Sequence, residues 1–166
     1  LPSESLNTSL LMPTLLEICQ ARQIPFTGGI IEAVQKNVPA LMAFDARTGA
    51  QVWEFDPLPR DPADPAAKSW AQGTAEGYGG GNVGSDMAAD QALDLVSLPT
   101  ASPSGDFYGG DRAGDNHYST SVVALKGSTG EVVWHFQFVH HNVFDYDVPT
   151  QPLLIDFPHT GKLVPA

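Results

Sequence analysis

The sequence predicts an all-β protein built from stacked, repeated hairpin units. The main observation is a repeat: residues 43–53 and residues 124–134 both fit the frame Ala-x-x-x-x-Thr-Gly-x-x-x-Trp. Agreement over so long a frame is hard to reach by chance, and a repeated supersecondary unit indicates stacked modules rather than one closed globule. The composition agrees, because 16 glycines, 14 prolines and a charged fraction of 16% favour a loop-rich β protein over a helical bundle.

Each copy of the frame predicts a β-hairpin that is closed by a tryptophan. Apolar residues precede and follow a turn rich in Asp, Ser, Thr and Gly, at 45–49 in the first copy and 127–130 in the second. Asp and Ser side chains bond to turn amides, and glycine adopts positive φ without strain. We expect Trp53 and Trp134 to begin the returning strands and to bury their rings against a neighbouring module. The alternative is two unrelated hairpins, each with an ordinary core tryptophan.

The N-terminal segment, residues 1–38, precedes the first hairpin at residues 39–55 and is otherwise unassigned. We expect a short helix in it, because four apolar residues share one helical face: Leu11, Leu15, Ile18 and Cys19. The segment lacks a basic leader and is a poor match to a signal peptide. No stretch of the sequence is apolar for long enough to cross a bilayer.

The region between the two repeats divides into four parts. Residues 56–71 form a proline-rich excursion, because proline cannot donate to a sheet ladder. Residues 77–84 form a glycine-dense loop, which lacks the Lys-Ser/Thr ending of a phosphate-binding loop. Residues 86–98 predict another hairpin, with 92–98 as its apolar strand. Residues 99–118 predict an irregular segment.

Charge and cysteine content limit the partners. Eight basic residues face nineteen acidic ones, so the chain repels phosphate backbones and anionic membrane surfaces, and we expect no nucleic-acid partner. The single cysteine, Cys19, excludes an internal disulfide and a metal cluster made of several cysteines.

A polar cluster follows the second repeat. Within residues 140–147, two histidines, an asparagine and two aspartates are interleaved with aromatic residues. Asp145 and Asp147 share one side of an extended segment, where their carboxylates could bind a hard cation such as calcium. A carboxylate beside a cation could also act as a general base toward a substrate hydroxyl. On spacing alone, a solvated acidic loop with structural histidines is the favoured interpretation. A zinc site built on His140 and His141 is disfavoured, because adjacent side chains diverge.

Together these motifs resemble the pyrroloquinoline quinone (PQQ)-dependent dehydrogenases, especially the membrane-type glucose and quinate dehydrogenase branch. The resemblance runs from about residue 39 to residue 166 and keeps its motifs in one order. These motifs are G-G-G-N-V at 79–83, D-F-Y-G-G-D-R at 106–112, G-D-N-H-Y at 114–118, S-V-V-A-L at 121–125 and W-H-F-Q-F-V-H-H-N-V-F-D-Y-D-V-P-T-Q-P at 134–152.

The resemblance implies an architecture. The repeated frame is similar to that family's tryptophan-docking motif, which locks together the blades of an eight-bladed β-propeller. Residues 39–166 would then be partial propeller repeats, because blades of about 40–50 residues allow two to three in this length. We expect a fragment or truncated, diverged member, with the missing propeller blades among its partners.

The resemblance also implies a reaction. The catalytic base of that family heads the final D-x-D, which is Asp145 here. Asp147 matches a second acid that some alcohol-oxidising relatives use as an extra metal ligand, and His140 and His141 match paired histidines lining the same loop. Asp145 would take the proton of a sugar or alcohol hydroxyl, hydride would pass to the quinone, and Ca²⁺ would polarise the quinone carbonyl. Electrons would leave to a membrane quinone or a cytochrome, on the periplasmic side of the inner membrane.

Four positions depart from the family pattern. Gly84 stands where a tryptophan usually stacks on the quinone. Ser102 stands where an asparagine ligand is expected, and it lacks the amide oxygen that would bind a cation more strongly. Asn142 and Phe144 replace an aspartate and a tryptophan. Gly84 and Ser102 favour a second hypothesis, a non-catalytic β-propeller module acting as an assembly scaffold, whereas the intact Asp-Tyr-Asp at 145–147 favours the enzyme.

Overall fold

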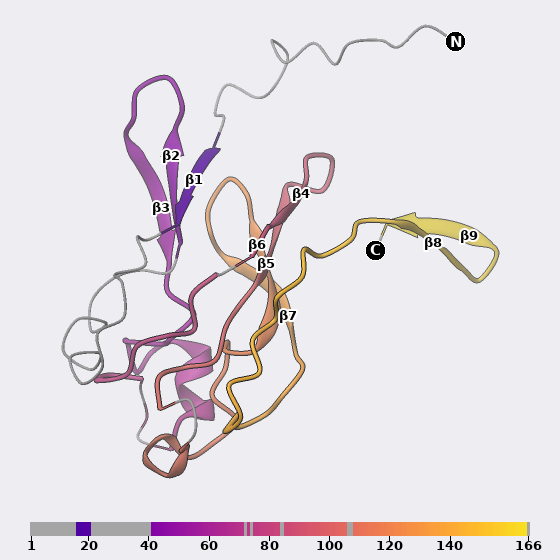
Figure 1. The fold of residues 1–166 in the computed structure, drawn as a ribbon. Helices are drawn as coiled ribbons and strands as arrows, with labels where there is room; N and C mark the ends of the chain where they lie inside the picture. The colour runs from indigo at the N-terminus through magenta and orange to yellow at the C-terminus, as the bar shows by residue number, and fades with distance from the viewer. Residues whose placement is uncertain are drawn as a thin grey trace, which may run out of the picture.

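A computed structural model describes residues 16–20, 41–71, 73, 75–83, 85–105 and 108–165. Within these ranges the chain folds into nine strands in three antiparallel sheets, with two short 3-10 helices in the connections (Figure 1). None of the described helices is long and apolar enough to span a membrane. The all-β prediction is confirmed.

The first sheet contains the first repeat. Its strand order is β1 (Leu16–Gln20), β2 (Leu41–Asp45) and β3 (Gln51–Phe55), so the hairpin predicted at 39–55 is confirmed. The prediction of an N-terminal helix is wrong over Ile18 and Cys19. Both residues belong to strand β1, which pairs with β2. A short apolar run is compatible with a strand as well as with a helix. Here the strand forms, because the edge of β2 provides a pairing partner for all five residues of β1. Leu11 and Leu15 lie outside the described residues.

The second sheet contains the second repeat. Its order is β4 (Ala88–Asp90), β5 (Leu95–Pro99), β6 (Ser121–Lys126) and β7 (Val132–Gln137). The hairpin predicted at 86–98 is confirmed, although β5 begins at Leu95 rather than at residue 92. The reason is a wider turn, in which Asp94 has a φ of 54° and the Leu93 amide donates to the Asp90 carboxylate at 3.0 Å.

The two copies of the frame have the same strand pairing. Ala43 lies opposite Trp53, and Ala124 lies opposite Trp134. In both hairpins the register shifts at the residue that follows this alanine. The repeat in the sequence is therefore also a repeat in backbone geometry. It includes the register shift, which no residue type in the frame predicts.

The core lies between these two sheets. Its buried members are Leu41, Ala43, Trp53, Phe55, Ala66, Val83, Val96, Leu98, Tyr118, Val123 and Leu125. The Trp53 indole donates to the Gly127 carbonyl at 2.9 Å, and Gly130 lies against the face of its ring. The first repeat thus docks its tryptophan on the turn of the second, as the sequence predicts. The same prediction is wrong for Trp134, which is 45% exposed because no described unit packs on its side of the sheet.

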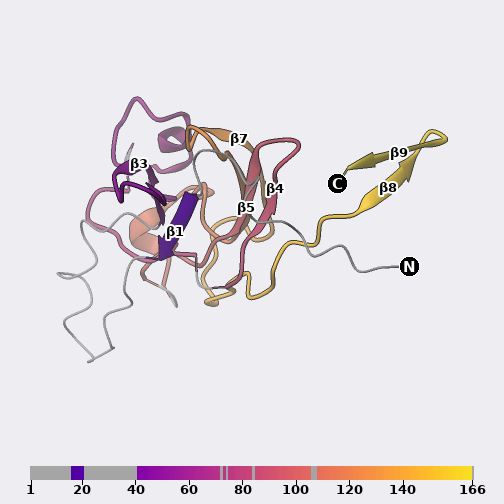
Figure 2. The ribbon, with the colours of Figure 1, turned by 90° about the horizontal axis from the view of Figure 1, so that it is seen from above.

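The connections complete the structure. The proline-rich excursion contains the 3-10 helix Pro65–Ser69, capped by Asp64, and it buries Trp70 completely. The second 3-10 helix, Gly110–Arg112, lies in the irregular segment before β6. After β7 the chain passes back along the second sheet and ends in the hairpin of β8 (Asp156–His159) and β9 (Lys162–Pro165), which extends away from both sheets (Figures 1 and 2).

Candidate functional site

The loop that follows β7 is organised by Asn142, whose side chain is buried. Its amide nitrogen donates to the Thr120 hydroxyl and to the Tyr146 carbonyl, both at 3.0 Å. Its amide oxygen accepts from the Phe144 backbone at 3.0 Å. These bonds fold the loop around one amide group and hold Asp145 at a φ of 56°, a left-handed conformation that aspartate tolerates better than most residues. Asn142, which replaces an aspartate of the family pattern, therefore holds the loop together.

The structure brings Ser102 and Asp147 together. The Ser102 amide donates to the Asp147 carboxylate at 2.8 Å, and the Asp147 amide donates to the Asp145 carbonyl at 3.1 Å. Ser102 is buried, and its hydroxyl has no hydrogen-bond partner among the described residues. A buried polar atom without a partner is uncommon and costs desolvation free energy, so this hydroxyl is a candidate ligand atom.

Asp145 lies at the exposed tip of this loop. Loss of hydration, and secondly the negative charge of Asp147, raise the pKa of the Asp145 carboxyl above its ordinary value of 3.8. A carboxylate with a raised pKa holds a proton more firmly, which is the property that a general base needs.

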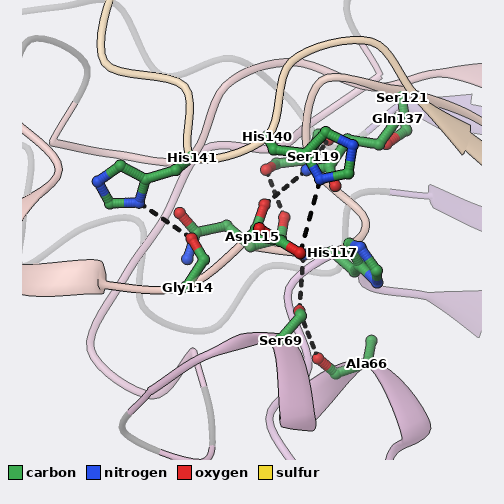
Figure 3. A network of polar contacts seen from close by, with 11 residues as sticks. Ala66, Ser69, Gly114, Asp115, His117, Ser119, Ser121, Gln137, His140 and His141 are labelled. Atoms are coloured by element: carbon green, nitrogen blue, oxygen red, sulfur yellow. Dashed lines mark hydrogen bonds and ion pairs between the residues drawn. The ribbon is translucent and has the colours of Figure 1, made fainter.

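The paired histidines contact a different segment. The His140 Nδ1 lies 3.6 Å from a carboxylate oxygen of Asp115, and the His141 Nδ1 lies 3.0 Å from the Gly114 carbonyl (Figure 3). The His141 ring also lies directly against Gly109, where an added Cβ would meet its Nε2 at 2.7 Å. The predicted site residues therefore fall into two groups, Ser102 with the acidic pair and the histidines with residues 109–115.

Gly84, the remaining predicted site residue, lies outside the described residues. Its described neighbours contact the segments that carry Ser102 and Asp147. Val83 forms a β-bridge with Thr100, and the Ser85 hydroxyl donates to the Val148 carbonyl at 3.2 Å.

A buried arginine, Arg112, links these loops, although its sequence context predicted no role for it. Arg112 is fully buried, and it donates to the Asn116 side chain at 2.8 Å, to the Gly105 carbonyl at 3.1 Å and to the Asn142 carbonyl. The Asn116 amide donates back to the Arg112 carbonyl at 2.7 Å. A guanidinium carries five donors in a rigid fork, which suits it to join several backbone segments. The signal in the sequence was that Arg112 and Asn116 lie within two of the motifs that carry the family resemblance, at 106–112 and 114–118.

The donor set of the acidic pair suits a hard cation. Asp145 and Asp147 carry carboxylate oxygens, and Ser102, whose amide donates to the Asp147 carboxylate, carries a hydroxyl oxygen. Calcium prefers oxygen ligands of these kinds. The residues present therefore fit the cation that the resemblance implies, with a hydroxyl in place of an amide oxygen.

The architecture defines the class of protein: antiparallel hairpin units joined by a docked tryptophan, as in a β-propeller. The comparisons then identify the family, because residues 26–166 match the family model for the PQQ-binding "Glucose/ethanol/alcohol dehydrogenase, beta-propeller domain". The chain belongs to this family of PQQ-dependent dehydrogenases.

Curated relatives agree in sequence. The chain is 34% identical over 158 residues to quinoprotein glucose dehydrogenase A of Acinetobacter calcoaceticus, a match that covers 93% of this chain and 19% of that protein. It is 37% identical over 142 residues to the quinate/shikimate dehydrogenase (quinone) of Acinetobacter baylyi, covering 78% of this chain and 16% of that protein. The chain thus spans less than a fifth of the length of these relatives.

Solved structures agree in fold. The quinohemoprotein alcohol dehydrogenase of Comamonas testosteroni superposes with a TM-score of 0.63 at 28% identity, covering 75% of this chain and 20% of that one. A europium-containing methanol dehydrogenase superposes with a TM-score of 0.60 at 28% identity, covering 75% of this chain and 24% of that one.

Proposed function

We propose that this chain is part of a PQQ-dependent dehydrogenase that oxidises a hydroxyl group of a sugar or alcohol, with Asp145 as the general base. The observation that carries the proposal is the acidic pair beside the unpartnered Ser102 hydroxyl, in a chain that belongs to this family. Residues 39–166 are the proposed propeller repeats, and β1 adds an outer strand to the first of them.

The residues have distinct proposed tasks. Asp145 and Asp147 hold the cation, helped by the Ser102 hydroxyl, and the Ser102 amide fixes the Asp147 carboxylate. Asp145 accepts the proton of the substrate hydroxyl, while Gly84, His140 and His141 border the cofactor. When bound, PQQ supplies a hydride acceptor and the cation a Lewis acid.

The proposal extends to partners and place. The relatives named above act on glucose and on quinate or shikimate, so a small polyol or sugar is the proposed substrate class. A membrane quinone or a cytochrome is the proposed electron acceptor, on the periplasmic side of the inner membrane. Calcium is the proposed cation, and the europium-containing neighbour makes a trivalent lanthanide ion the alternative to test.

Cofactor binding is the first test. The chain is titrated with PQQ in the presence of Ca²⁺, and in a second series with La³⁺, and the tryptophan fluorescence and quinone absorbance are followed. A saturable change supports the proposal. If neither cation gives one, the assembly-scaffold alternative replaces it.

The role of Asp145 is tested in the natural protein that contains this chain. Asp145→Asn keeps the shape and removes the base, so reduction of an artificial electron acceptor should fall by about 10²–10⁴-fold with PQQ binding retained. Asp156→Asn, an exposed aspartate in β8, is the matched control and should keep the full rate. Equal rates for Asp145→Asn and the control would refute Asp145 as the base.

A further inference from the structure

Three potential metal ligands meet beside the histidine pair, outside the acidic pair described above. Asp115, His117 and His140 each place a ligand atom within 4.8 Å of the other two. Asp115 and His117 precede β6, whereas His140 follows β7, so the fold brings together residues that are distant in the sequence. Figure 3 shows the Asp115 carboxylate beside His140, with His117 close to both.

The backbone of this cluster is fixed from several sides. The Asp115 carbonyl accepts from the Gln137 side chain at 2.6 Å and from the His141 amide at 3.3 Å. The His117 amide donates to the Ser69 hydroxyl at 2.8 Å, and the His117 carbonyl accepts from the Trp70 indole at 2.8 Å. These bonds hold the backbone of Asp115 and His117, so the main chain loses little freedom when an ion binds, which favours affinity.

The ligand types select a class of metal. Two imidazole nitrogens and one carboxylate oxygen suit Zn²⁺ and its neighbours Ni²⁺ and Cu²⁺ rather than Ca²⁺ or Mg²⁺. Burial lowers the pKa of His117, which favours the neutral imidazole that a metal requires. A tetrahedral zinc ion needs its ligand atoms about 3.3 Å apart, given Zn–N distances of about 2.0–2.1 Å. Asp115 and His140 have exposed side chains and can turn inward to reach that spacing.

We propose that Asp115, His117 and His140 form a binding site for a late first-row divalent cation, with Zn²⁺ as the reference ion. The site has three protein ligands, which leaves a fourth position for water or another small ligand. The bound ion would cross-link the segment before β6 to the loop after β7. This metal site does not depend on the proposed dehydrogenase function. His140 belongs to both proposals, so the test is done without PQQ.

The test titrates the metal-free chain with Zn²⁺ in competition with a chromophoric chelator, and with Co²⁺ by its visible absorption. We expect one ion per chain, and long-range ¹H–¹⁵N spectra in which the rings of His117 and His140 shift while that of His159 does not. His140→Gln should weaken Zn²⁺ binding by at least tenfold, since even outer-shell partners of a metal contribute about 10–100-fold. His140 is exposed, so this substitution leaves the core intact.

His159→Gln, in the exposed β8 strand, is the matched control and should bind Zn²⁺ as tightly as the wild type. Millimolar Ca²⁺ should not displace Zn²⁺, because a site with two imidazoles disfavours calcium. Zn²⁺ binding that is absent, that is equal in His140→Gln and the control, or that yields to Ca²⁺ would overturn the proposal. The last result would place the ion at the acidic pair.

Discussion

The two repeats have one sequence frame and one strand pairing, yet their tryptophans lie in opposite surroundings. Trp53 is 7% exposed and docks on the turn of the second repeat, whereas Trp134 is 45% exposed. Other large apolar side chains of β7 and the loop after it are exposed as well: Val133, Phe136 and Phe138. The frame therefore specifies the hairpin, and the neighbouring unit decides whether the tryptophan is buried. A further blade packed on β7 would cover this face.

The turns of the two repeats also share their backbone geometry but differ in their side-chain contacts. Asp45 in the first copy accepts from the Arg47 amide and from the amide and hydroxyl of Thr48, whereas Lys126 in the second copy forms an ion pair with Asp94 at 3.5 Å. The backbone bonds are nevertheless alike, since the glycine amide donates to residue 45 or 126 at 2.7 Å in each turn. Glycine at positive φ is the shared requirement, and the side chain of the third frame position is not.

The largest expected effect separates the two tryptophans. Trp53→Ala empties a buried site and should lower the free energy of unfolding by about 3–5 kcal/mol. Trp134→Ala removes a half-exposed ring and should cost about 1 kcal/mol or less. Urea unfolding followed by circular dichroism measures both, and similar losses would contradict unequal docking.

A smaller effect separates the two turn glycines. Gly130→Ala places a Cβ 2.8 Å from the Trp53 ring at a φ of 77°, so strain and overpacking should together cost about 2–4 kcal/mol. Gly49→Ala is the matched control, because it has a similar φ of 72° but open space around it, and it should cost about 1 kcal/mol from strain alone. Thermal unfolding compares the two, and equal melting temperatures would argue against the contact of Gly130 with Trp53.

The smallest effect concerns pH. Hydrogen bonds, first from the Thr48 backbone, then from the Thr48 side chain and the Arg47 backbone, lower the pKa of Asp45 below 3.8. A lowered pKa means that this stabilisation is present above pH 3.8 and is lost as the pH falls through the folded-state value. Asp45→Ala should therefore be less stable than the wild type at neutral pH, and the difference should shrink on acidification. Urea unfolding of both proteins across the acidic range measures this difference, and a difference that stays constant down to about pH 2 would contradict the role of the Asp45 carboxylate.

Local chemistry made much of the fold predictable. Turn residues and the tryptophan frame predicted three hairpins, and all three are present. The helix expected near Ile18 failed because its pattern was short and the edge of β2 competed for those residues. The roles of Arg112 and Asn142 depend on contacts between segments distant in the sequence, so no local sequence pattern could predict these roles.

The candidate site was predictable to the same extent. The resemblance selected Asp145 and Asp147, and the structure adds the contact of Asp147 with Ser102. The zinc site that the sequence suggested, and disfavoured, used only the adjacent histidines His140 and His141. The partners that the fold provides for His140 are Asp115 and His117, which lie before β6.

Collisional quenching by acrylamide tests the difference between the repeats most directly, because it reports the exposure of each indole. The wild type has three tryptophans, of which Trp53 and Trp70 are buried. Trp134→Phe should remove most of the quenchable fluorescence, and Trp53→Phe should leave that component in place. Quenchable emission that survives Trp134→Phe and disappears with Trp53→Phe would contradict the docking of the first repeat on the second.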